Sequence, residues 1–129
     1  MMLIAKNMKP DKKCRLYLAL AVLETTGLVC FSFLPFIGFV RTGLRLGDLE
    51  HFIAYAVYGF LVNRTHSCLA PDSKRKILIA AVAGSLVGGL CETIQFFLPY
   101  RTADITDWFI DTTGSFAGAA LSLSFKDRF

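Results

Sequence analysis

ILIAAVAGSLVGGLCETIQFFLPYRTADITDWFIDTTGSFAGAALSLSF, residues 77–125, contains two long apolar runs separated by a short polar turn. The first run, residues 77–98, ends at Pro99 and is long enough to cross a hydrocarbon core, which takes about 20 helical residues. The second run, residues 105–125, follows the favoured N-cap residue Asp104 and carries Asp107 in its first turn, where a negative charge suits the helix dipole. This stretch therefore predicts two transmembrane helices joined by a short turn.

Two further apolar runs precede this pair. Residues 16–39 are long enough to span a membrane, and we expect the helix to end near Pro35. Residues 49–62 cover only about 21 Å at 1.5 Å per residue, so this helix must be extended by flanking residues or end below the headgroup level. We predict an all-α membrane protein, a single domain over residues 1–129 that forms a bundle of about four transmembrane helices.

The composition agrees with lipid as the main solvent. Hydrophobic residues make up 54% of the chain and the mean hydropathy is +0.52, which is too apolar for an ordinary soluble domain of 129 residues. The net charge of +4 does not come from a basic stripe interleaved with aromatic residues, so we expect no nucleic-acid partner. The cysteines show no CxxC or metal-ligand spacing, which indicates free thiols, and no cofactor is predicted; they are Cys14, Cys30, Cys68 and Cys91.

The distribution of Lys and Arg predicts the orientation. Because these residues concentrate in cytoplasmic loops, we expect a multi-pass protein of the cytoplasmic membrane with both termini in the cytoplasm. Eleven of the 14 fall on the predicted inner side, namely Lys6, Lys9, Lys12, Lys13, Arg15, Arg64, Lys74, Arg75, Lys76, Lys126 and Arg128. The other three are Arg41, Arg45 and Arg101.

Polar side chains gather at the predicted outer end of the bundle. The set consists of Asp48, His51, Tyr55, Glu92, Gln95, Arg101, Asp104, Asp107 and Asp111. Small residues continue the faces that carry the acids on the third and fourth helices, so these faces should pack together and bury the acids; they are Gly84, Gly88, Gly114 and Gly118. We therefore expect a polar pocket open to the outside, with His51, Glu92, Asp107 and Asp111 around it.

Two segments resemble the VanZ-like family of bacterial membrane proteins: GDLEHFIAYAVYGFL, residues 47–61, and CETIQFFLPYRTADITDWFIDTTGSFAG, residues 91–118. The family pattern is Asp and His before Tyr, then Glu and Gln before Phe, Pro and Arg, and then Asp, Asp, Asn and Gly. FSFLP, residues 31–35, is similar to the end of the family's first helix. By resemblance the signature positions are Asp48, His51, Tyr55, Glu92, Gln95, Pro99, Arg101, Asp104, Asp107 and Gly114. Asp111 stands where the family usually has Asn.

The resemblance implies a cell-envelope setting, because the family is named for a protein that confers low-level teicoplanin resistance. Our first hypothesis is that the outer pocket binds a membrane lipid or a lipid-linked or wall-related molecule and affects glycopeptide susceptibility. A membrane enzyme is the alternative, with His51, Glu92 or Asp107 as catalytic candidates and Arg101 holding an anionic group. The third hypothesis is a purely structural or partner-binding bundle, whose protein partners are unknown.

Simpler roles remain open for several of these residues. Asp48 and Asp104 are natural N-caps, and pairs between the acids and Arg101 could serve only to lock the bundle. His51, Glu92, Asp107 and Asp111 could hold a divalent cation, but without a tight ligand motif no metal site is predicted. Glu24, inside the first helix, should face the interior as a packing or hydrogen-bonding residue, and His66 should be solvated in the cytoplasmic loop.

Overall fold

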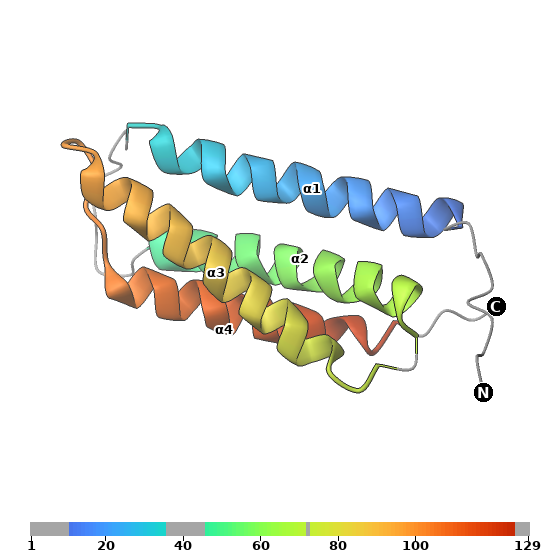
Figure 1. Cartoon of the computed structure of the whole chain (residues 1–129). Coiled ribbons are helices and arrows are strands. Elements are labelled where there is room, and N and C mark those ends of the chain that lie inside the picture. Colours follow the sequence, from blue (N-terminus) through green and yellow to red (C-terminus); the bar gives the residue numbers. More distant parts are fainter. Residues whose placement is uncertain (1–10, 36–45, 72, 126–129) are drawn as a thin grey trace, which may run out of the picture.

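The computed structural model describes residues 11–35, 46–71 and 73–125, and within these ranges it contains four α-helices and no strand (Figure 1). The prediction of an all-α fold with four helices is confirmed. The helices are α1 (Lys12–Phe33), α2 (Leu46–Leu69), α3 (Lys76–Phe97) and α4 (Ile105–Ser122).

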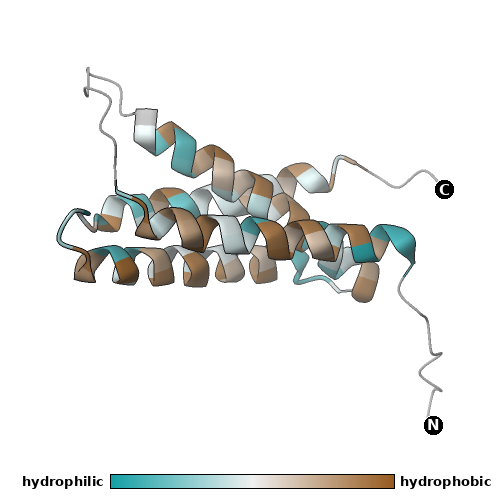
Figure 2. Ribbon diagram, turned by 90° about the horizontal axis from the view of Figure 1, so that it is seen from above, coloured by the Kyte–Doolittle hydropathy of each residue, from teal (hydrophilic) through white to brown (hydrophobic). Residues whose placement is uncertain are grey.

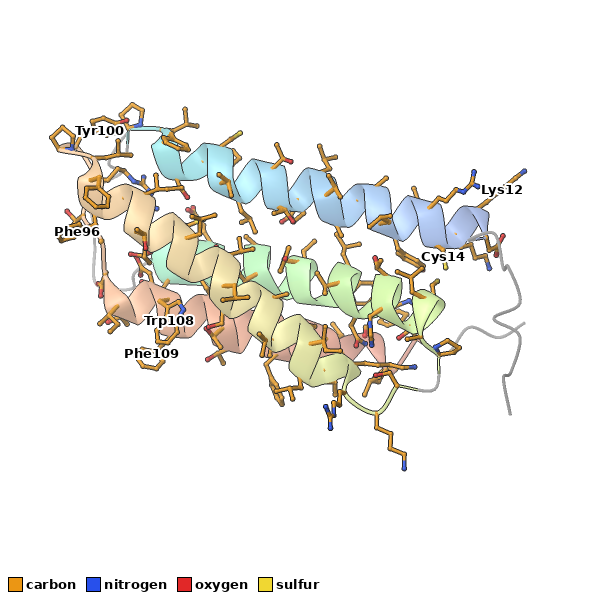
Figure 3. The ribbon with its side chains drawn as sticks, in the orientation of Figure 1. Lys12, Cys14, Phe96, Tyr100, Trp108 and Phe109 are labelled. Atoms are coloured by element: carbon orange, nitrogen blue, oxygen red, sulfur yellow. The ribbon has the colours of Figure 1, made fainter. Side chains whose placement is uncertain are left out.

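The helices alternate in direction along the bundle (Figure 1). We call the end that carries Tyr100 and the α3–α4 turn, residues 98–104, the turn end, and the opposite end, which carries Lys12, the basic end (Figure 3).

Prolines end two of the helices. Pro35 follows α1 and Pro99 follows α3, and the residues before them, Leu34 and Leu98, are both extended. A residue before proline is driven out of the α conformation by the proline ring, so each helix stops there. Residues 36–39, which were predicted to continue the first helix, lie outside the described residues.

The second helix is longer than residues 49–62, the apolar run that predicts it. α2 has 24 residues and continues through Arg64 and His66, which the sequence had placed in a cytoplasmic loop. Arg64 is only 7% exposed, and the His66 Nε2 atom is buried, so the assignment of both residues to a loop, and the expectation of a solvated His66, were wrong. The helix continues because these polar side chains are buried within the bundle instead of being solvated beside it.

Partners on two helices explain how α2 keeps these polar residues inside. The Asn63 amide donates to Ala119 O at 3.3 Å and to the hydroxyl of Ser122 on α4. Arg64 donates through Nη1 to Phe125 O at 2.7 Å, and its guanidinium lies 5.1 Å from the ring centroid of Tyr17 on α1. One buried cluster at the basic end therefore joins α1, α2 and the C-terminal end of α4.

The centre of the bundle is the contact between α2 and α4, which is the most extensive of the helix pairs. A Cβ at Gly114 would lie 2.6 Å from Phe52 O, and one at Gly118 would overlap the carbonyl of Ala56. The expectation that these two glycines face the third helix was therefore wrong, because they face α2. On α3, Gly88 does lie against α4 as expected, since its Cβ would come 2.9 Å from Asp111 Oδ2.

The outside of the bundle is apolar and its centre is partly polar. Brown, apolar residues run along the helices in Figure 2, and large side chains such as Leu86 and Phe96 are 70% and 74% exposed. The largest fully buried side chains are instead Asn63, Asp111, Ser115 and Ser122. This distribution is typical of a bundle solvated by lipid. Two helices, α1 and α3, are long and apolar enough to cross a membrane.

Helix α1 packs only on α2 and α3 within the described part of the chain. Polar contacts attach it near both ends: Tyr17 lies under Arg64 at the basic end, and the Tyr100 hydroxyl donates to Phe33 O at 2.8 Å at the turn end. Its exposed residues are mostly large and apolar. The four cysteines form no disulfide with one another, as the sequence predicts.

Candidate functional site

A hydrogen-bonded pair lies between α2 and α4 near the turn end. The Nδ1 atom of His51 is 2.8 Å from Oδ1 of Asp111. The Asp111 side chain is fully buried, whereas 28% of the His51 side chain is exposed. The carboxyl group thus fixes the orientation of the imidazole from inside the bundle, while part of the ring remains accessible.

Close helix packing creates the place for this pair. Gly114 lets α4 approach the backbone of α2 at Phe52, next to His51, and Gly88 leaves room for the Asp111 carboxyl against α3. Tyr55, one turn beyond His51, is 2% exposed and close enough to Asp111 to interact with it electrostatically. The small residues therefore allow three helices to enclose one acidic side chain.

A second contact joins α3 to the start of α4. The backbone N–H of Asp104 donates to Glu92 Oε2 at 2.7 Å, and the Asp104 side chain caps α4 by accepting from the Thr106 N–H at 2.8 Å. The other carboxyl oxygen, Glu92 Oε1, is buried and has no hydrogen-bond partner among the described residues. One oxygen of Glu92 is thus fixed by the backbone, and the other is enclosed by the protein.

Asp107 lies between these two contacts. It is half-buried in the first turn of α4 and interacts electrostatically with both His51 and Glu92. The structure therefore brings together the four titratable residues expected around the pocket, His51, Glu92, Asp107 and Asp111. Gln95, on the same helix as Glu92, is also buried, with 4% of its surface exposed.

Two residues of the predicted set do not join this group. Asp48 is the third residue of α2, so it is not the N-cap that the sequence suggested, and it makes no side-chain hydrogen bond or ion pair with another described residue. Arg101 lies half-buried in the α3–α4 turn, where its backbone N–H donates to Leu98 O at 3.2 Å. Its guanidinium forms no ion pair with the acids in the described ranges, so a pair between Arg101 and an acid that locks the bundle is absent there.

A shallow groove of about 450 Å³ opens beside Glu92 at the turn end. Its lining is mostly apolar and aromatic, and two predicted site residues take part in it. The lining consists of Glu92, Thr93, Phe96, Phe97, Ala103, Asp104, Ile105 and Trp108. The Trp108 indole is held in place because Nε1 donates to Ser85 O at 2.9 Å, and Figure 3 shows Trp108 toward the same end of the bundle as Phe96. The groove therefore combines a carboxyl group with aromatic walls.

The metal alternative finds no geometric support in the described part of the chain. No three of its His, Cys, Asp and Glu side chains lie close enough to hold one ion together. Glu24 is half-buried near the middle of α1.

The sequence analysis missed the buried polar residues on the part of α2 and α4 that lies toward the basic end. Ser115 and Ser122 are 0% and 2% exposed and continue the α4 face that begins at Asp107 and Asp111. Their helical spacing from Asp111 was the available signal. Asn63 had no comparable signal, because its partner Ser122 lies 59 residues away along the chain.

Comparisons with known proteins identify a family for this chain. No curated protein and no solved structure matches the chain. The model of the VanZ/LLP1 family matches residues 5–126, which is nearly the whole chain. The protein, with its four helices and a polar site near the α3–α4 turn, belongs to the VanZ/LLP1 family.

Proposed function

We propose that all four helices cross the membrane, with both termini in the cytoplasm and the turn end outside. The helices have between 18 and 24 residues, and even the 18 residues of α4 extend about 27 Å. The described Lys and Arg residues support this orientation, because all except Arg101 lie on α1, on α2, in the α2–α3 loop or at the first residue of α3, toward the basic end. Polar residues of α2 and α4 are compatible with spans because the two helices pack on each other.

We further propose that the groove at the turn end binds a lipid-linked or wall-related molecule of the cell envelope. The observation that carries this function is the groove itself, in which aromatic walls lie beside the acidic residues Glu92 and Asp104. An amphiphile suits such a surface, because its apolar chain can lie along Phe96 and Ile105 while a polar group reaches the carboxyl. The neighbouring Asp107, Asp111 and His51 support the polar side of the site, and family membership favours an effect on teicoplanin susceptibility.

Charge-removing variants test the function. Glu92→Gln and Asp107→Asn are nearly isosteric, and Arg101→Ala removes a cation that contacts none of the described acids. We expect Glu92→Gln and Asp107→Asn to lose the envelope phenotype while membrane abundance stays normal. Teicoplanin susceptibility and detergent-solubilised stability are measured together, in a host where the wild type has an effect. Full activity in stable Glu92→Gln protein would refute the proposal, whereas degradation of these variants would favour a structural role.

An enzyme is the second candidate, favoured by the contact between His51 and Asp111. A buried carboxyl that holds one ring nitrogen of an accessible histidine is the arrangement that supports general acid–base chemistry at the other nitrogen. His51→Gln should then abolish turnover of an envelope lipid while ligand binding and folded yield persist. Unchanged turnover in this variant would exclude His51 as the catalytic base or acid.

A further inference from the structure

Three consecutive cations, which we call the loop cations, lie where the α2–α3 loop enters α3: Lys74, Arg75 and Lys76. The first two are exposed and the third is half-buried, and none of them makes an ion pair with another described residue. The local backbone is held in place, because the Arg75 N–H donates to the Ser73 hydroxyl at 3.3 Å and the Ile79 N–H donates to Arg75 O at 2.9 Å. The loop thus presents three positive charges that no described acid compensates.

An apolar row follows the loop cations along α3 and consists of Leu78, Val82 and Leu86. These residues are spaced four apart, so they lie on one side of the helix, and all three are exposed. Gly84 and Gly88 lie on the other side of α3, against α4. The row therefore faces away from the bundle, on a helix that is long and apolar enough to cross a membrane.

The length of the apolar row matches one leaflet of a bilayer. From Lys76 to Leu86 the helix rises about 15 Å at 1.5 Å per residue, and half of a hydrocarbon core is also about 15 Å thick. A lipid whose headgroup lies beside the loop cations therefore has its acyl chains alongside the row for most of their length.

Charge complementarity identifies the headgroup. Lysine and arginine side chains at a membrane surface attract anionic lipids, and a phosphate accepts charge-assisted hydrogen bonds from both. A zwitterionic headgroup offers the same phosphate but carries its own ammonium, so the net attraction is lost. We propose that the loop cations and the apolar row form a binding site for a phospholipid with a net negative headgroup, in the leaflet at the basic end. This inference rests on α3 crossing the membrane and concerns the end of the bundle opposite the groove.

A second group of exposed cations at the basic end provides a matched control. Lys12 and Arg15 lie in the first turn of α1. Helices α1 and α3 are joined near the turn end, where the Tyr100 hydroxyl donates to Phe33 O, and they diverge toward the basic end (Figure 1). Lys12 and Arg15 therefore carry charge at the same end of the bundle but away from the apolar row.

A tryptophan in the apolar row tests the site. The reporter protein is the full chain with Val82→Trp and with Trp108→Phe, which removes the only other tryptophan. It is reconstituted in phosphatidylcholine vesicles with increasing fractions of lipids that carry bromine on their acyl chains, which quenches tryptophan on contact. We expect half-maximal quenching by brominated phosphatidylglycerol at about a tenfold lower fraction than by brominated phosphatidylcholine, and added salt should reduce this difference.

Two double variants of the reporter protein locate the charge that matters. Each replaces one exposed lysine and one exposed arginine by glutamine. Lys74→Gln with Arg75→Gln should move the phosphatidylglycerol curve most of the way to the phosphatidylcholine curve. Lys12→Gln with Arg15→Gln should leave the preference for phosphatidylglycerol in place.

The other outcomes overturn the site in distinguishable ways. Equal quenching by the two lipids, or a preference that survives both Lys74→Gln with Arg75→Gln and added salt, would refute recognition by the loop cations. Equal loss of preference in the two double variants would replace the site with a general attraction by the charge of the whole basic end. Absence of quenching by either lipid would show that Val82 does not face hydrocarbon, which would refute the membrane-spanning position of α3.

Discussion

Replacing Gly114 with Ala tests the contact between α2 and α4 with a single methyl group. The new Cβ would lie 2.6 Å from Phe52 O and 3.3 Å from Phe52 C, whereas ordinary contacts begin at 3.4 Å. The helices must therefore separate by about 0.8 Å at this point, and overpacking of this kind costs about 1–3 kcal/mol. Alanine also favours a helix over glycine by about 0.5–1 kcal/mol, which partly conceals that cost.

Gly27→Ala is the matched control for this propensity effect. A Cβ at Gly27, in the interior of α1, meets nothing within 4 Å, so this variant should be slightly more stable than wild type. The difference between the two alanine variants isolates the overlap, and we expect Gly114→Ala to be less stable than Gly27→Ala by about 1–3 kcal/mol. Unfolding of the detergent-solubilised proteins by SDS titration measures this difference. Equal stability of the two variants would refute the close approach of α4 to Phe52.

Three other outcomes follow from contacts described above. His51→Ala should lower folded yield in detergent, because it leaves the buried Asp111 carboxyl without its partner at a cost of up to about 3–5 kcal/mol, whereas Asp111→Asn keeps a hydrogen-bonding group and should fold. In single-cysteine backgrounds, Cys68 should resist a membrane-impermeant thiol reagent applied to intact cells and Tyr100→Cys should react; the reverse pattern would invert the topology. Arg64→Lys should lower the unfolding midpoint, because an ammonium cannot reproduce the stacked, planar contacts of the guanidinium, and an unchanged midpoint would contradict a structural role.

The helices could be predicted largely because lipid imposes simple requirements on a sequence. Long apolar runs were sufficient to find four helices, and the extended residues before Pro35 and Pro99 fixed the ends of α1 and α3. The C-terminal half of α2 could not be found in this way. Its polar residues, such as Asn63 and Arg64, resemble a loop until their partners on α4 and α1 are known, and those partners are distant in sequence.

The candidate site was predictable as a set of residues but not as an arrangement. Helical spacing placed His51, Glu92 and Asp111 near one end of the bundle, and the structure brings them together. Spacing within one helix does not specify which neighbour that helix faces, so Gly114 and Gly118 were assigned to the wrong partner. For the same reason the hydrogen bond from the Asp104 N–H to Glu92 Oε2 could not be foreseen.

The dominant contact of the bundle joins its second helix to its fourth, and this has a consequence for biogenesis. Until α4 leaves the ribosome, the close-packing surface of α2 around Phe52 and Ala56 has no partner, and neither has the imidazole of His51. In the proposed topology of four spans, the earlier helices therefore wait in the bilayer with polar groups uncovered, and the core forms only when the last helix inserts. A translational pause or a premature stop before residue 105 would leave the protein in a state that membrane quality control can recognise.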